Sequence, residues 1–89
     1  MNVNKLFKAL DDPTRRRILE LLKEKDLSAG EIGAQFPISG ASISHHLSLL
    51  FDAGLVRRQK RGQQVIYGLD ETVFQGIVEW IYSLKKEGK

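Results

Sequence analysis

Residues 39–69 read SGASISHHLSLLFDAGLVRRQKRGQQVIYGL, and this stretch decides the fold. A serine that can cap a helix opens it, and apolar residues then recur at the spacing of an amphipathic helix as far as Gly54. Glycine there can adopt the left-handed conformation that ends a helix. Two extended runs, 55–60 and 64–69, flank Arg61-Gly62-Gln63, which predicts a two-stranded hairpin with a basic tip.

A second short helix is predicted just before this stretch. Ser28 and Glu31 have the spacing of a capping box, in which each side chain accepts a hydrogen bond from a free backbone amide. Phe36-Pro37 must end that helix, because proline cannot extend it. Two short helices joined by a turn and followed by a hairpin are typical of a winged helix-turn-helix, whose second helix enters the DNA major groove.

Further amphipathic helices are predicted on both sides of this unit. The first runs from Val3 to the break at Asp11-Asp12-Pro13, and Asp12 then caps a second helix that extends to about Lys23. Asp70 opens a final helix with an apolar stripe. The predicted fold class is mainly α with a β-hairpin (α+β), a winged helix-turn-helix in the order α-α-α-α-β-β-α, formed as a single domain over residues 1–89.

Length and composition limit the classes of protein that this chain can belong to. Its 89 residues leave no room for a second, catalytic domain, and the absence of cysteine excludes disulfides, thiolate metal sites and a cysteine nucleophile. Residues 1–5 lack the basic patch and apolar run of a signal peptide, so we expect a cytoplasmic location. The uncharged stretch 32–51 contains proline, glycines, serines and histidines, which a lipid-facing helix would not carry together.

The outer face of the helix over 39–52 suggests contact with DNA. With steps of about 100° per residue, Ala41, Ser44, His45 and Ser48 fall opposite the apolar stripe centred on Ile43. Small and hydrogen-bonding side chains let a helix sink into the major groove and read base edges. The alternative is an ordinary solvent-exposed helix, but such a face normally carries lysine and glutamate.

Positive charge is concentrated beside this helix. Residues 32–69 hold four basic side chains against one acidic side chain, within a chain of formal net charge +3. The basic residues, Arg57, Arg58, Lys60 and Arg61, could reach phosphates or the minor groove, although lysine and arginine also protect exposed edge strands from pairing. The predicted DNA-contact residues are Ser39, Gly40, Ala41, Ser42, Ser44, His45, Ser48, Arg58, Lys60, Arg61 and Gln63.

Other polar residues are interpreted as structural. His46 lies about 60° from the apolar stripe and fits a packing role, and it diverges too far from His45 on the helix to chelate one metal with it. Arginines 15–17 are also interpreted as structural, because Glu20 and Glu24 could pair with Arg16 and Arg17 along their own helix.

An enzyme is not expected. Ser44, His45 and Asp52 all lie on the outside of one helix and cannot form a triad, and the chain has no paired carboxylates and no phosphate-binding glycine loop. The remaining alternative to a DNA-binding protein is a winged-helix module that docks on an acidic protein surface. No cofactor is expected under either interpretation.

The terminal helices carry more apolar surface than one small core requires. Two-fold pairing of the chain through these helices would place two recognition helices about one DNA turn apart. The alternative is that both helices only complete the monomer core. The predicted dimer interface comprises Val3, Leu6, Phe7, Leu10, Phe74, Ile77, Val78, Trp80, Ile81 and Leu84.

Three pieces of the chain together resemble the ArsR-type winged-helix repressors: FKALDDPTRRRILELL, SISHHLSLLFDAGLV and RGQQVIYGL. The length and the ending TVFQGIVEWI look more like the autorepressors of that family than its metal sensors. The resemblance implies a homodimer that binds double-stranded operator DNA and blocks transcription. It places the base-reading helix on residues 39–46 and the wing contacts on residues 60–63.

The same resemblance argues against metal control. Metal sensors of the family commonly have cysteines where this chain has Ser28 and Gly30, or acidic and histidine ligands in the last helix, where this chain has no histidine. We therefore expect no metal site. Among the autorepressors, release from DNA by a membrane-bound anti-repressor protein is implied instead.

Overall fold

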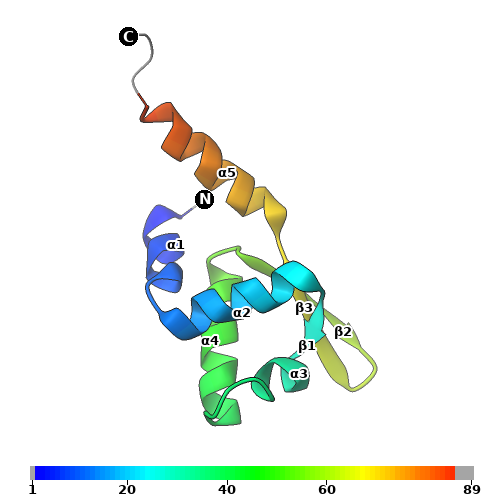
Figure 1. The fold of residues 1–89 in the computed structure, drawn as a ribbon. Coiled ribbons are helices and arrows are strands. Elements are labelled where there is room, and N and C mark those ends of the chain that lie inside the picture. The colour runs from blue at the N-terminus through cyan, green and yellow to red at the C-terminus, as the bar shows by residue number, and fades with distance from the viewer. Residues whose placement is uncertain (1, 86–89) are drawn as a thin grey trace.

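The computed structural model describes residues 2–85, which form five helices and three strands (Figure 1). In chain order these are α1 (Val3–Leu10), α2 (Pro13–Glu24), β1 (Leu27–Ser28), α3 (Ala29–Gly33), α4 (Gly40–Asp52), β2 (Val56–Arg61), β3 (Gln64–Leu69) and α5 (Glu71–Ser83). The predicted α+β winged helix-turn-helix is confirmed, and the structure adds strand β1 to it.

Strand β1 completes a three-stranded sheet. It pairs antiparallel with β3, with Leu27 opposite Tyr67, and β3 pairs with β2, so the strand order is β1-β3-β2. A two-residue strand is too short to show a period of two in the sequence, and only the returning hairpin supplies its hydrogen bonds. Strand β1 thereby ties the start of α3 to the hairpin β2–β3, which we call the wing.

Capping side chains begin the helices at the predicted positions. Ser28 Oγ accepts from the Glu31 backbone N–H at 3.0 Å and the Glu31 carboxylate accepts from the Ser28 N–H at 2.8 Å, which completes the capping box. The hydrogen bond from the Ser28 backbone holds the pKa of Glu31 below its usual value. At the start of α4, Ser39 Oγ accepts from the Ser42 N–H at 3.0 Å. The other two predicted caps, Asp12 and Asp70, are also observed.

Gly54 ends α4 in the left-handed conformation, with φ of +79°. Its N–H donates to the Phe51 carbonyl at 2.9 Å, and the Leu55 N–H donates to the Leu50 carbonyl at 3.0 Å. These two bonds form a Schellman motif, in which Leu50 and Leu55 are both fully buried. The motif turns the chain from the recognition helix directly into the first wing strand.

A Gly54→Ala substitution is expected to lower the free energy of unfolding by roughly 1 to 3 kcal/mol. A side chain is strained at this φ, and its Cβ would lie 2.9 Å from Val73 Cγ2. Chemical denaturation measures the loss. Gly30→Ala is the matched control, because its Cβ would make only ordinary contact, at 3.9 Å from Ser28 Oγ. Equal stability of the two variants would contradict the expectation.

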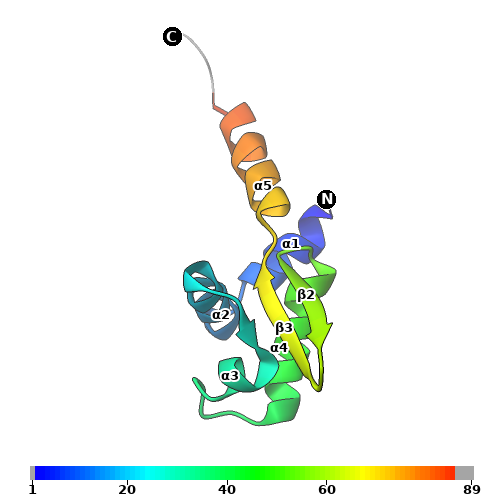
Figure 2. The same ribbon diagram turned by 90° about the vertical axis from the view of Figure 1, so that its right-hand side faces the viewer.

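The core lies between α1, α2, α3, α4 and the inner face of the sheet, as the two perpendicular views show (Figures 1 and 2). Helix α5 continues away from this body, and the molecule measures 53 × 23 × 22 Å. Of the residues of α5, only Ile77 is buried. None of the helices between residues 2 and 85 combines the length and apolar character that crossing a bilayer demands.

Candidate nucleic-acid interface

Helix α4 presents one buried and one exposed face, as its sequence pattern predicts. Its apolar stripe, Ile43, Leu47 and Leu50, is buried in the core. The opposite face lies at the surface, and no acidic side chain occurs in residues 32–51 to repel a polyanion. The exposed residues at the cap and along this face are Ser39, Gly40, Ala41, Ser44, His45 and Ser48; Ser42 is half-buried.

One basic residue of the wing is engaged within the protein. Arg57 forms an ion pair with Asp26, with Nη2 to Oδ2 at 3.1 Å, and this pair joins β2 to the segment between α2 and β1. Arg57 lies opposite Gly68, where a Cβ would approach Asp26 Oδ1 to 2.5 Å, so glycine leaves room for the pair. Arg57, which the sequence groups with the cations that could reach phosphates, is therefore already paired within the protein.

Arg58 lies on the other face of β2 and contacts the recognition helix. Its guanidinium carbon lies 3.8 Å from the centre of the Phe51 ring, a cation–π contact between the wing and α4. Side chains alternate along a strand, so Lys60 shares this face of the wing. Arg58 remains exposed, and its contact with Phe51 links the wing to α4.

The tip of the wing is a two-residue turn between Arg61 and Gln64, which are paired. Gly62 has φ of +60° at the first turn position, the arrangement of a type II′ turn, which matches the twist of the strands. Lys60, Arg61 and Gln63 are exposed, and the two cations make no ion pair among the described residues. The tip therefore offers free positive charge beside the acid-free face of α4.

The three consecutive arginines of α2 have separate roles. Arg17 forms an exposed ion pair with Glu20 at 3.1 Å, as expected for a structural pair, and Arg16 donates to the Leu10 carbonyl at 2.7 Å. Arg15 is only 8% exposed and donates to backbone carbonyls of α1 and to His46. Sequence reasoning identified none of these partners of Arg15, because they come together only in the folded chain.

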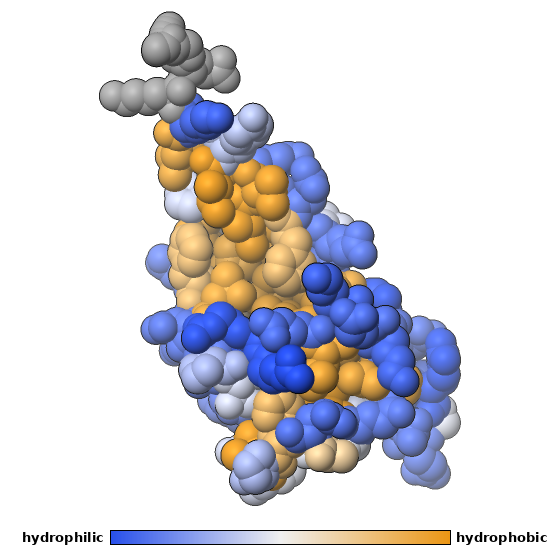
Figure 3. All heavy atoms as spheres, in the orientation of Figure 1, coloured by the Kyte–Doolittle hydropathy of each residue, from blue (hydrophilic) through white to orange (hydrophobic). Residues whose placement is uncertain are grey.

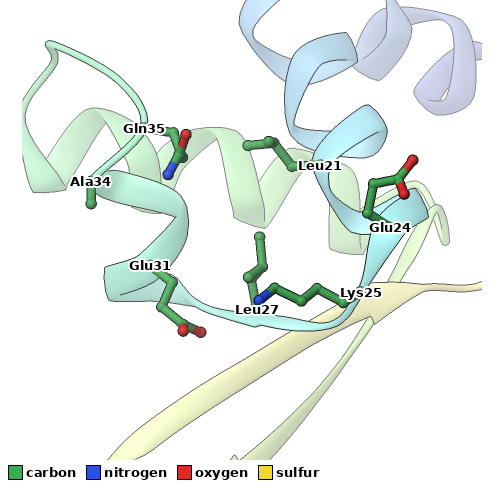
Figure 4. Close-up of a pocket in the computed structure, with 7 residues that line it drawn as sticks. All are labelled: Leu21, Glu24, Lys25, Leu27, Glu31, Ala34 and Gln35. Carbon is green, nitrogen blue, oxygen red and sulfur yellow. The ribbon is translucent and has the colours of Figure 1, made fainter.

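A groove of about 360 Å³ opens between α2, β1 and α3 (Figure 4). Leu21, Leu27 and Ala34 line it, and Glu24, Lys25, Glu31 and Gln35 surround them. Its lining includes no residue predicted to contact DNA. Of the two glutamates that the sequence offers as partners for the arginines of α2, Glu20 pairs with Arg17 and Glu24 lines this groove.

Potential metal ligands are not gathered in the part of the chain that is described. Residues 2–85 contain no group of three or more histidine, cysteine, aspartate or glutamate side chains placed to hold an ion. The rings of His45 and His46 diverge, with centroids 6.2 Å apart and planes tilted by 50°.

Hydrophobic side chains gather on the surface of α5 and the adjoining α1, as Figure 3 shows from one side. Val78 is 58% exposed and Ile81 is 55% exposed, and the rings of Phe7 and Trp80 contact each other with centroids 6.0 Å apart. Leu6 and Ile77 are instead buried in the core of a single chain, so the predicted interface loses these two residues. The other exposed apolar residues here are Tyr82 and Leu84.

Known proteins resemble this chain in sequence and in fold. The transcriptional repressor SdpR of Bacillus subtilis is 44% identical over 97% of this chain and 96% of its own length. A homologue of the cadmium resistance regulatory protein CadC from Staphylococcus aureus is 36% identical over 98% of this chain and 73% of its own. An ArsR-like transcriptional regulator from Rhodococcus superimposes with a TM-score of 0.85 at 29% identity, covering 92% of this chain and 75% of that one.

The sequence profile of the arsR family of bacterial regulatory proteins matches residues 12–58, which span α2 through the first half of β2. This family consists of regulators rather than enzymes, in agreement with the expectation from the sequence. The family match covers more than half of the chain, and the SdpR similarity extends over nearly all of it. The chain therefore belongs to the arsR family of bacterial regulatory proteins.

Proposed function

We propose that this protein is a homodimeric transcriptional repressor that acts in the cytoplasm and binds an inverted-repeat operator. The observation that carries the proposal is the exposed, acid-free face of α4 beside a wing tip with two free cations. Its 44% identity to a protein named as a transcriptional repressor supports repression as the outcome of binding. Residues 1–89 act as one DNA-binding domain in this proposal.

The two parts of the interface have different tasks. Ser44 and His45 lie on the exposed face of α4, where their side chains can donate to or accept from base edges. The amides at Ser39 and Gly40 begin the helix, where its dipole favours a phosphate. Lys60 and Arg61 hold the neighbouring phosphate backbone, which adds affinity without sequence preference.

The apolar surface on α1 and α5 is proposed to bind a second copy of the chain. A contiguous hydrophobic surface of this kind marks an association site, and a two-fold dimer presents the same surface from both partners. Pairing there would leave both copies of α4 free to occupy half-sites about 34 Å apart. The proposed interface comprises Val3, Phe7, Leu10, Phe74, Val78, Trp80, Ile81, Tyr82 and Leu84.

Repression is proposed to be independent of metal. The chain contains no cysteine and only two histidines, which are adjacent on α4 and diverge. From the resemblance to autorepressors we further propose that the operator lies in the promoter of the protein's own gene. A membrane-bound anti-repressor protein then releases the repressor from this operator. Footprinting on that promoter tests autoregulation, and a footprint that persists with excess EDTA is expected.

Selection of bound sequences from a random pool of double-stranded DNA tests the proposed function. The expected result is an inverted repeat whose half-sites are separated by about one helical turn. Recovery of sequences without a consensus would overturn the proposal and would favour a winged-helix module that binds an acidic protein surface.

Substitutions in the two parts of the interface are expected to have different effects on DNA binding. Arg61→Ala should weaken binding to operator and random DNA alike and lower the slope of log affinity against log salt by about one unit. Ser44→Ala and His45→Ala should weaken operator binding selectively, by about 5- to 100-fold. Electrophoretic shifts at several salt concentrations measure both effects. A flat salt response of the unmodified protein would contradict phosphate binding by the wing.

A further inference from the structure

Arg15 is a buried cation at the junction of three helices. Its Nε donates to the Ala9 carbonyl at 2.8 Å and its Nη2 donates to the Lys8 carbonyl at 3.0 Å, so it holds the last turn of α1. Its remaining nitrogen, Nη1, lies 3.1 Å from His46 Nδ1 on the recognition helix. One side chain of α2 therefore connects the end of α1 to α4.

The chemistry of the guanidinium fixes the state of His46. An arginine has only N–H donors, so His46 Nδ1 must accept the hydrogen bond and the neutral ring must carry its proton on Nε2. Protonation would place an N–H on Nδ1, where donor would face donor and two cations would lie 3.1 Å apart. The contact between α2 and α4 is therefore compatible only with a neutral imidazole.

Asp12 lies near the pair but does not replace it. Its Oδ2 lies 3.9 Å from His46 Nδ1, too far for a hydrogen bond. It accepts instead from the Arg15 backbone N–H at 3.0 Å, and this bond holds the pKa of Asp12 below its usual value. The Arg15 guanidinium is therefore the hydrogen-bond partner of His46 Nδ1.

At the start of α2, His46 lies near Arg15 and Asp12, and Arg15 in turn binds two backbone carbonyls of α1. On α4 itself, His45 lies with its ring centroid 6.2 Å away. His46 is half-buried, with its side chain 16% exposed, whereas His45 is exposed.

We propose that Arg15 and His46 are a positioning pair for the recognition helix, and that loss of their hydrogen bond releases α4 from this position and lowers discrimination between operator and other DNA. The inference rests on the proposed DNA-binding function. In this inference His46 does not contact DNA. Its ring acts by fixing α4 against the α1–α2 junction. Phosphate contacts of the wing do not depend on this pair, so the affected quantity is the ratio of affinities for operator and scrambled DNA.

The test compares this ratio at pH 7.5 between two substitutions of His46. His46→Leu removes the acceptor and is expected to lower the ratio by about fivefold, the usual value of one hydrogen bond. His46→Asn keeps an acceptor near the position of Nδ1, so its ratio should remain that of the unmodified protein. An unchanged ratio in His46→Leu, or an equal fall in both variants, would overturn the proposal.

A measurement without DNA separates this inference from the proposed function. The ring nitrogen resonances of His46 should show Nδ1 as a hydrogen-bond acceptor, and the amide signals of α4 should shift in His46→Leu but not in His46→Asn. Arg15→Lys, which cannot reproduce the planar fork, should abolish the preference for the Nε2–H form. Failure of these signatures contradicts the pair even if operator binding is found. Their presence supports the pair even if the unmodified protein selects no operator. Circular dichroism confirms that each variant is folded.

Discussion

Ile81→Glu is expected to convert the protein to a monomer and to weaken operator binding by at least about 100-fold. A dimer that occupies two half-sites gains the second contact at a high effective concentration, and this gain, about 10²- to 10⁴-fold, is lost when the subunits separate. Ile81 is 55% exposed on the apolar surface of α5, so glutamate is solvated in a single chain but would be buried without a partner between two chains. Sedimentation equilibrium and an electrophoretic shift measure the two effects.

Ser83→Glu is the matched control for this substitution. It adds the same charge two residues further along α5, and successive residues are about 100° apart, so position 83 points away from the side of Ile81. The control is expected to remain dimeric and to bind operator as the unmodified protein does. If Ile81→Glu were dimeric, or if it were monomeric and bound operator with undiminished affinity, the proposed interface or its part in DNA binding would be wrong.

Leu50→Ala is expected to lower the free energy of unfolding by about 2 to 5 kcal/mol. Leu50 is fully buried, and its carbonyl accepts the hydrogen bond that turns the chain from α4 into the wing. Truncation removes apolar contacts and leaves a cavity beside that turn. A domain of this kind typically has about 5 to 15 kcal/mol of total stability, so the loss is a large share of it. Chemical denaturation at fixed protein concentration measures the effect and avoids changes in dimer population.

Leu49→Ala provides the comparison at the neighbouring position. Leu49 is half-buried and lines a small groove between α1 and α4 rather than the core. The same substitution there removes fewer contacts and opens a space that solvent already reaches. Its effect should be less than half of that at Leu50, and equal losses at the two positions would contradict the assignment of Leu50 to the centre of the core.

The local signals in the sequence predicted most of the elements. The capping box at Ser28 and Glu31, the cap at Ser39 and the left-handed Gly54 are interactions between residues at most a few positions apart, and each is observed. The wing was predicted from its two extended runs and its basic turn, and its first strand is displaced by one residue, to Val56–Arg61. The predicted end of α3 was less accurate. The sequence places the limit of this helix at Phe36-Pro37, whereas the helix already stops at Gly33.

The sequence could not assign tasks to the individual arginines. Arg57 is paired with Asp26 and Arg15 with His46, and each pair joins residues 31 positions apart. Arg58 was predicted to bind DNA and is held against Phe51, while Lys60 and Arg61 remain free at the tip. A composition count gives all of these cations the same weight. Their partners are chosen by the approach of separate elements, which no local pattern encodes.

By itself, the sequence determined the helix starts, the amphipathic faces, the acid-free surface of α4 and the resemblance to a family of repressors. These features follow from side-chain periodicity and from hydrogen bonds that close within one turn. Only the tertiary structure decided that Leu6 and Ile77 belong to the core, that β1 joins the sheet and that Arg15 connects α1 to the recognition helix. Burial and long-range hydrogen bonding depend on which surfaces meet, and that is fixed only when the helices pack against the sheet.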